Sequence, residues 1–125
     1  MTDSRYANGA RPSLLLVEDD SAVRRGLQLL LQGQGFDVRA FASSRTALAD
    51  AAKVGAQYLV IDYLLADMDG VALLGALRAQ GWNGVAVLIT AFSSPTLRET
   101  ASVAGFATVL DKPFRDDDLL RALRR

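Results

Sequence analysis

Short apolar runs alternate along this chain with segments whose apolar residues recur at helical spacing, and this alternation limits the possible folds more than any other feature. Five runs have the length and composition of buried strands: 14–17, 36–41, 58–61, 85–89 and 109–110. A helical pattern follows each run; the first four end at Gly33, Gly55, Gly81 and Gly105, and the last spans 116–125. Strand and helix repeated five times predict an α/β fold, a doubly wound five-stranded parallel sheet covered on both faces.

The strand order follows from how apolar each run is. The runs that begin at Leu14 and Val85 are the most apolar, and 58–61 resembles them, so we expect these three strands in the centre of the sheet. The run 36–41 instead alternates apolar residues with Asp37 and Arg39, which is typical of an edge strand. The order 2-1-3-4-5, one of the doubly wound arrangements, fits this pattern.

The first and fourth helical patterns differ in the width of their apolar side. The first has an apolar stripe that should face the sheet, made of Val23, Leu27, Leu30 and Leu31. The fourth has only a thin apolar side, made of Leu97, Ala101 and Ala104. We therefore expect the first helix to be well packed and the fourth to be weakly held.

Composition excludes several classes of function. The chain has 125 residues, the usual size of one domain, and its 14 basic residues balance 14 acidic ones, which gives no basic footprint for nucleic acid or for an anionic membrane. Cysteine and histidine are both absent, which removes thiol nucleophiles, thiolate zinc sites and histidine bases. No apolar run approaches the roughly 18 residues of a membrane span. We expect one cytoplasmic domain at 13–125, preceded at 1–12 by a disordered leader or a cloning remnant.

Polar residues stand where the predicted strands end. Glu18 and Asp19 follow the first strand, Asp62 the third, Thr90 the fourth and Lys112 the fifth. In a parallel sheet these ends share one edge, where open α/β folds place ligands. Each residue alone could merely end a strand or cap a helix, but carboxylates gathered there repel one another unless a cation is present.

The residue types at this edge indicate a particular chemistry. Oxygen ligands of this kind suit Mg2+ (or Mn2+) rather than zinc. The ammonium of Lys112 and the hydroxyl of Thr90 could hold phosphoryl oxygens opposite the metal. The set therefore favours attack of the Asp62 carboxylate on a phosphoryl group, with the charge that develops neutralised by metal and lysine.

The chain resembles a response-regulator receiver domain, the phosphoacceptor module of two-component signalling, which has a flavodoxin-like fold. The resemblance covers nearly the whole chain from Ser13 onward. It rests on four motifs: Leu16-Val17-Glu18-Asp19-Asp20, Asp62 with Met68-Asp69-Gly70 after it, Ile89-Thr90-Ala91, and Asp111-Lys112-Pro113-Phe114.

The resemblance implies a role for each site residue. Asp62 would take the phosphoryl group from a phosphohistidine of a sensor histidine kinase or a phosphotransfer protein. Asp19, Asp62 and the backbone carbonyl of Leu64 would bind Mg2+ directly, and Glu18 through water. Thr90 would move to bond the phosphoryl group, Lys112 would pair with it, and the Lys112–Pro113 bond would be cis. The fourth helix, fifth strand and fifth helix would form the output face, open to an effector domain or a homodimer partner.

Three departures from the family pattern bear on these expectations. Ala66 stands where the family often has proline, so the loop after Asp62 is expected to be looser. Val109 replaces the family's switch aromatic, which leaves the coupling from Thr90 to the output face in question. Leu64 and Phe92, at positions that tune dephosphorylation, are both apolar.

Three other functions compete with this one. An aspartyl phosphohydrolase usually has a second Asp two residues after its nucleophile, where this chain has Leu64, which transfers no proton. A nucleotide or flavin binder would need a Gly-, Ser- or Thr-rich loop after the first strand, where this chain has Glu18 and Asp19. A receiver-like protein-binding module that acts without phosphorylation remains the main alternative, and Val109 is its best support.

Overall fold

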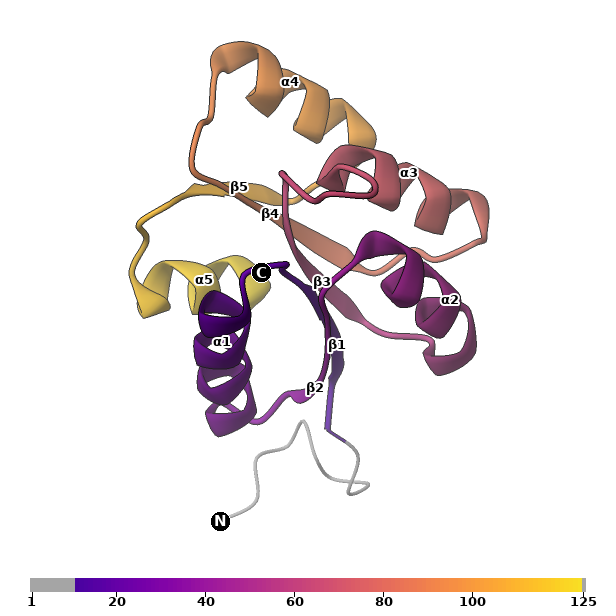
Figure 1. Ribbon diagram of the computed structural model, residues 1–125, viewed down its shortest axis with the longest axis vertical. Helices are drawn as coiled ribbons and strands as arrows, with labels where there is room; N and C mark the ends of the chain where they lie inside the picture. Colours follow the sequence, from indigo (N-terminus) through magenta and orange to yellow (C-terminus); the bar gives the residue numbers. More distant parts are fainter. Residues whose placement is uncertain (1–10, 125) are drawn as a thin grey trace.

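Strands and helices alternate without exception in the computed structural model, which describes residues 11–124 apart from the side chains of 51–54 (Figure 1). The strands are β1 (Ser13–Val17), β2 (Asp37–Phe41), β3 (Tyr58–Asp62), β4 (Val85–Thr90) and β5 (Thr108–Asp111). The helices are α1 (Ser21–Gly33), α2 (Ser44–Val54), α3 (Gly70–Ala79), α4 (Pro95–Ala104) and α5 (Asp116–Leu123). The predicted alternation is therefore confirmed.

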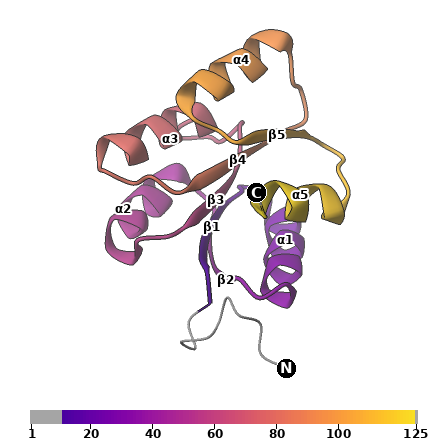
Figure 2. The same cartoon turned by 180° about the vertical axis from the view of Figure 1, so that it is seen from behind.

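The five strands form one parallel sheet in the order β2-β1-β3-β4-β5. This is the predicted order, with β2 at one edge and the apolar strands β1, β3 and β4 in the centre. Figures 1 and 2 show α1 and α5 together on one side of the sheet and α2, α3 and α4 on the other. The fold is thus a doubly wound α/β sandwich.

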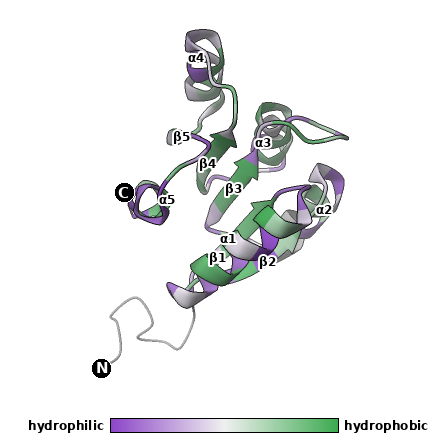
Figure 3. Ribbon diagram, turned by 60° about the vertical axis from the view of Figure 1, so that its left-hand side comes forward, coloured by the Kyte–Doolittle hydropathy of each residue, from purple (hydrophilic) through white to green (hydrophobic). Residues whose placement is uncertain are grey.

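Side chains that alternate along each central strand supply two separate cores. Leu15, Leu59 and Leu88 point toward α2, α3 and α4. Leu14 and Val60 point the opposite way, toward α1 and α5. Because both faces are covered, the central strands are apolar between their ends, as the green of their middle parts in Figure 3 shows. Complete burial of each such side chain contributes about 1.5–3 kcal/mol, so the sheet core supplies most of the stability.

Helix α1 differs from its predicted packing at the first turn. Leu31 is fully buried and Leu27 and Leu30 are half-buried, but Val23 is 38% exposed. The prediction that Val23 faces the core was wrong: Val23 packs against neither apolar cluster, whereas Leu27 and Leu30, further along α1, pack against the cluster that contains Leu31. The thin packing of α4 is confirmed, since Leu97 and Ala101 are its buried residues.

The predicted leader, 1–12, falls mostly outside the described residues. Pro12 is described, and its carbonyl accepts a hydrogen bond of 2.9 Å from the N–H of Asp37, which extends the pairing beside β2. Among the helices of the described residues, none is both long and apolar enough to cross a bilayer.

The first residue of α3 lies unusually close to the end of β3. A Cβ added to Gly70 would lie 2.8 Å from Leu88 Cδ1 and 3.1 Å from the carbonyl oxygen of Asp62. Leu88 is fully buried and cannot swing away freely. Only glycine therefore allows α3 to begin this close to the strand that ends in Asp62.

Replacing Gly70 by alanine is expected to lower the free energy of unfolding by about 1–3 kcal/mol, because the new methyl group overpacks the core. Gly75, in the same helix, is the matched control, since a Cβ there meets nothing within 4 Å. Gly75→Ala should raise stability by about 0.5–1 kcal/mol through helix propensity alone. Urea unfolding followed by Trp82 fluorescence measures both. A Gly70→Ala protein as stable as Gly75→Ala would contradict the close-packing argument.

Candidate functional site

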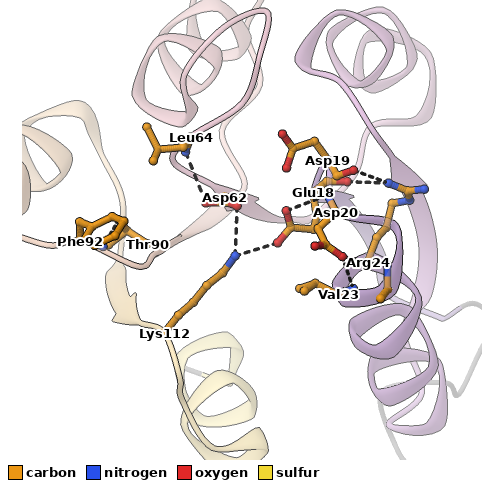
Figure 4. A network of polar contacts seen from close by, with 11 residues as sticks. Glu18, Asp19, Asp20, Val23, Arg24, Asp62, Leu64, Thr90, Phe92 and Lys112 are labelled. Carbon is orange, nitrogen blue, oxygen red and sulfur yellow. Dashed lines mark hydrogen bonds and ion pairs between the residues drawn. The ribbon is translucent and has the colours of Figure 1, made fainter.

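The carboxyl edge of the sheet carries the polar residues that the sequence analysis placed there. Glu18 follows β1, Asp62 ends β3, Thr90 ends β4 and Lys112 follows β5. Figure 4 shows the side chains of Glu18, Asp62 and Lys112 turned toward one another across this edge. The parallel topology therefore brings together residues that are up to 94 positions apart in the chain.

The ammonium of Lys112 bridges two carboxylates. Its Nζ lies 2.9 Å from Glu18 Oε1 and 3.1 Å from Asp62 Oδ2. The Glu18 side chain is only 2% exposed and that of Asp62 13%, so both ion pairs are shielded from water. The Lys112–Pro113 peptide bond that follows is cis, as the resemblance implied.

The electrostatics of the site are set by this burial and by the ion pairs. Burial raises the pKa of Glu18; the neighbouring Asp62 raises it further, while the hydrogen bond from Lys112 opposes both. Burial alone would lower the pKa of Lys112, but its two carboxylate partners outweigh burial and raise it. The site thus stabilises a cation next to Asp62 and holds an excess of negative charge around it.

Three carboxylates at this edge are close enough to share one ion. Glu18, Asp19 and Asp62 each offer an oxygen, and these oxygens lie within 4.8 Å of one another. Asp19 is exposed, which leaves the cluster open to solvent on one side. A hard divalent cation such as Mg2+ fits this donor set, because it prefers carboxylate oxygens and retains several waters.

Local contacts hold the first acidic residues in place. Asp20 caps α1 and accepts hydrogen bonds from the N–H groups of Ala22 and Val23 at 2.9 and 3.0 Å. The guanidinium of Arg24 donates to the carbonyl oxygens of Glu18 at 2.8 Å and Asp19 at 3.5 Å. The sequence pattern did not indicate this contact, because helical spacing places Arg24 outside the apolar stripe of the first helix.

Thr90 is buried but does not contact the carboxylates. Its side chain is 1% exposed, and its hydroxyl oxygen accepts a hydrogen bond of 3.1 Å from the N–H of Phe92. Figure 4 shows this pair beside the cluster, with no dashed contact from Thr90 to Asp62 or Lys112. The backbone of Thr90 does reach Lys112, because its carbonyl accepts the Lys112 N–H at 2.8 Å.

Two apolar side chains stand exposed near the cluster. Leu64 is 57% exposed, and Phe92 is 78% exposed. The backbone N–H of Leu64 donates to Asp62 Oδ1 at 3.3 Å, which ties the start of the following loop to the carboxylate. Neither side chain is packed away into a core, so both remain available at the surface around the site.

The loop after Asp62 is also tied to α2. Asp67 accepts hydrogen bonds from the N–H groups of Ser44 and Arg45, and the Ser44 hydroxyl donates to the carbonyl of Met68. The sequence analysis gave no role to Asp67. No local signal could reveal this contact, because the bonded residues are 22 to 24 positions apart.

Position 109, where the resemblance expects an aromatic residue, holds a small apolar side chain. Val109 is partly buried against the core beneath α4. Arg98 of α4 reaches across to β5, where it forms an ion pair with Asp111 and donates to the Val109 carbonyl at 3.4 Å. The contact between α4 and β5 therefore includes a charged side chain alongside the thin apolar packing.

Comparison with known proteins gives consistent results. Residues 14–124 match the family model described as "Response regulator receiver domain". The chain is 31% identical over 118 residues to the transcriptional regulatory protein TrcR of Mycobacterium tuberculosis, covering 94% of this chain and 46% of TrcR. It is 33% identical over 110 residues to the transcriptional regulatory protein FixJ of Rhizobium meliloti, covering 88% of this chain and 54% of FixJ. The chain thus spans about half the length of these curated relatives.

Solved structures with the same fold include two that are more than 25% identical to this chain in sequence. The chemotaxis protein CheY4 of Vibrio cholerae is similar with a TM-score of 0.88 and 29% identity, covering 93% of this chain and 98% of that one. The receiver domain of the Francisella response regulator 1452 is similar with a TM-score of 0.83 and 26% identity, covering 89% and 93%.

Removing the ammonium of Lys112 tests how much it contributes to the free energy of unfolding. Lys112→Met is expected to lower the free energy of unfolding in metal-free buffer by about 1–3 kcal/mol, because it leaves the buried Glu18 beside Asp62 without a cation. The loss should shrink in a Glu18→Gln background, since the two residues share one interaction.

Arg39→Met is the matched control for the Lys112 substitution. Arg39 pairs with Asp50 at 2.6 Å on the surface, where its side chain is 51% exposed, so the loss there should be much smaller. Equal losses from Lys112→Met in the wild-type protein and in the Glu18→Gln variant, measured by urea unfolding, would contradict the bridging role.

Proposed function

This chain belongs to the response regulator receiver domains, the signalling modules of two-component systems, and on that basis we propose that Asp62 is its phosphoacceptor. The donor is a phosphohistidine of a sensor histidine kinase or a phosphotransfer protein. The observation that carries the proposal is the pair of contacts from Lys112 to Asp62 and to the buried Glu18. An acidic cluster with one fixed ammonium is suited to receive an anionic group that the carboxylates alone would repel.

The transfer is a substitution at phosphorus. A carboxylate oxygen of Asp62 forms the new bond to phosphorus, and the bond from phosphorus to the imidazole nitrogen of the donor breaks. The electron pair of that bond stays on the donor imidazole, and the product on this chain is an acyl phosphate. Lys112 is positioned to pair with a phosphoryl oxygen and to offset the charge that develops during transfer.

Glu18, Asp19 and Asp62, together with the backbone carbonyl of Leu64, would hold Mg2+. The support is the hard oxygen donor set and its spacing within 4.8 Å. When bound, the ion neutralises negative charge on the transferring group. Glu18, the most buried of these acids, would act through a water, as the resemblance implies.

The output face is α4, β5 and α5. The hydroxyl of Thr90 accepts the Phe92 N–H in the present state, and a phosphoryl oxygen on Asp62 offers that hydroxyl an alternative partner. A turn of Thr90 toward Asp62 would release the Phe92 N–H at the entry to α4. Because α4 buries little apolar surface, such a change can shift its position at low cost. The face would then bind an effector domain or a second copy of the chain.

Labelling with acetyl phosphate and Mg2+, followed by mass spectrometry of the trapped acyl phosphate, tests the acceptor. We expect one phosphoryl group on the wild-type protein and none on Asp62→Asn, because the amide is not a nucleophile of comparable strength. Asp50→Asn, which alters a partly exposed acid of α2 paired with Arg39, should label like the wild type. Equal labelling of Asp62→Asn and wild type would contradict the assignment, and an unlabelled wild type would favour the phosphorylation-independent binding module.

Loss of the phosphoryl group should be slow in this chain. Hydrolysis of the phosphoryl-Asp62 bond needs a water in line with the leaving carboxylate, and nearby side chains must position that water. The side chains of the exposed Leu64 and Phe92 offer no hydrogen bond for that purpose. We expect the variant with Leu64→Asn and Phe92→Glu to lose its phosphoryl group about tenfold faster than wild type.

Val103→Glu is the control for the decay experiment, because Val103 is an exposed apolar residue of α4. The Val103→Glu variant should lose its phosphoryl group at the wild-type rate. The amount of acyl phosphate is followed over time after acetyl phosphate has been removed. Equal or slower decay of the double variant would show that water access to Asp62 is governed by other groups.

A further inference from the structure

We propose that Asp67 and Ser44 are positioning residues that fix the loop 63–69 against the N-terminus of α2 and so preorganise the metal site. The inference rests on the proposed function, because it concerns the affinity of that site for Mg2+. The loop begins directly after Asp62 and contains Leu64, whose carbonyl is the proposed backbone ligand. Anything that fixes this loop therefore fixes one ligand relative to the carboxylates.

The carboxylate of Asp67 makes a two-point contact with α2. Its Oδ1 accepts the N–H of Ser44 at 3.2 Å, and its Oδ2 accepts the N–H of Arg45 at 3.0 Å. These N–H groups belong to the first turn of α2, where they have no partner within the helix. Charge on the carboxylate is also favoured by the positive end of the helix dipole. The two amides, that of Arg45 first, hold the pKa of Asp67 below its usual range.

Ser44 adds a third bond between the same two segments. Its hydroxyl donates to the carbonyl of Met68 at 2.9 Å, and the side chain is fully buried. A buried hydroxyl that is bonded to a loop carbonyl cannot exchange that partner for water without cost. The far half of the loop is therefore held by three hydrogen bonds to one helix terminus.

The near half of the loop is held by the sheet. The N–H of Tyr63 donates to the Ile89 carbonyl at 2.8 Å, and the N–H of Gly70 donates to the Tyr63 carbonyl at 2.9 Å. Between these fixed points the loop contains no proline to restrict its backbone, since Ala66 stands where the family often has one. The contacts from α2 therefore add to the Leu64 N–H bond to Asp62 and to the apolar packing of Leu65 and Met68 in restraining the loop.

Preorganisation of this kind acts on affinity through entropy. A loop that is already ordered loses little conformational freedom when its carbonyl becomes a ligand, whereas a free loop must be ordered at the moment of binding. Removing the contacts of Asp67 should therefore weaken Mg2+ binding even though Asp67 touches none of the ligating atoms. Its effect on the phosphoryl-transfer step at saturating metal should be small.

Calorimetric titration with Mg2+ tests the proposal on Asp67→Ala, Asp67→Asn and Ser44→Ala. We expect Asp67→Ala to weaken the affinity about fivefold, because it removes two hydrogen bonds. Asp67→Asn keeps one acceptor oxygen and should fall between Asp67→Ala and the wild type. Ser44→Ala should weaken the affinity as well. At saturating Mg2+ the labelling rate of Asp67→Ala with acetyl phosphate should return to within about twofold of wild type.

Ser94→Ala is the matched control, because Ser94 caps α4 through a 3.0 Å bond to the N–H of Leu97 and lies outside the loop. It should lower the free energy of unfolding, as loss of a cap does, and leave the Mg2+ affinity unchanged. Asp67 variants with wild-type affinity, or a Ser94→Ala protein weakened as much as Asp67→Ala, would overturn the positioning role while leaving the proposed function intact. A wild-type protein that binds no Mg2+ would overturn both.

Discussion

The contact of one ammonium group with two carboxylates is the interaction on which this site depends. Lys112 follows β5, Glu18 follows β1 and Asp62 ends β3, so the contact joins an edge strand of the sheet to two central ones. Glu18 is almost fully buried, and a buried carboxylate without a partner would be strongly destabilising. The charge of Lys112 therefore permits the burial of Glu18, and under the proposed function the same charge would also serve the chemistry at Asp62.

The architecture explains why polar chemistry gathers at one edge. Helices cover both faces of the sheet, so charged side chains cannot lie along the central strands and are confined to their ends. In a parallel sheet the carboxyl ends coincide, and the loops that follow them supply further groups. Gly70 lets α3 start against the end of β3, which keeps the loop after Asp62 short and close to the carboxylates.

The side chains around the cluster differ in their exposure. Leu64 and Phe92 are exposed near the carboxylates, where under the proposed function they would influence the access of water and of a partner protein. Thr90 links the site to α4 through the N–H of Phe92 and to β5 through the N–H of Lys112. A helix with as little buried surface as α4 is well suited to respond to a change at such a junction.

The sequence by itself determined the order of the strands and the edge of the sheet at which the polar residues meet. Hydrophobic periodicity is a local property, so the five strands, their order and the meeting of Glu18, Asp62 and Lys112 followed from spacing and from the geometry of parallel strands. The same reasoning failed for Val23, because periodicity marks the apolar side of a helix but not which of its turns the rest of the fold covers. Only the tertiary structure decided which partners the polar groups chose: Thr90 turns to Phe92, and Asp67 binds the first amides of α2. The Asp67 contacts join segments far apart in the chain, so their geometry exists only once α2 has packed beside the loop. The Thr90 contact is local, but the sequence pattern does not show that its hydroxyl bonds Phe92 rather than Asp62.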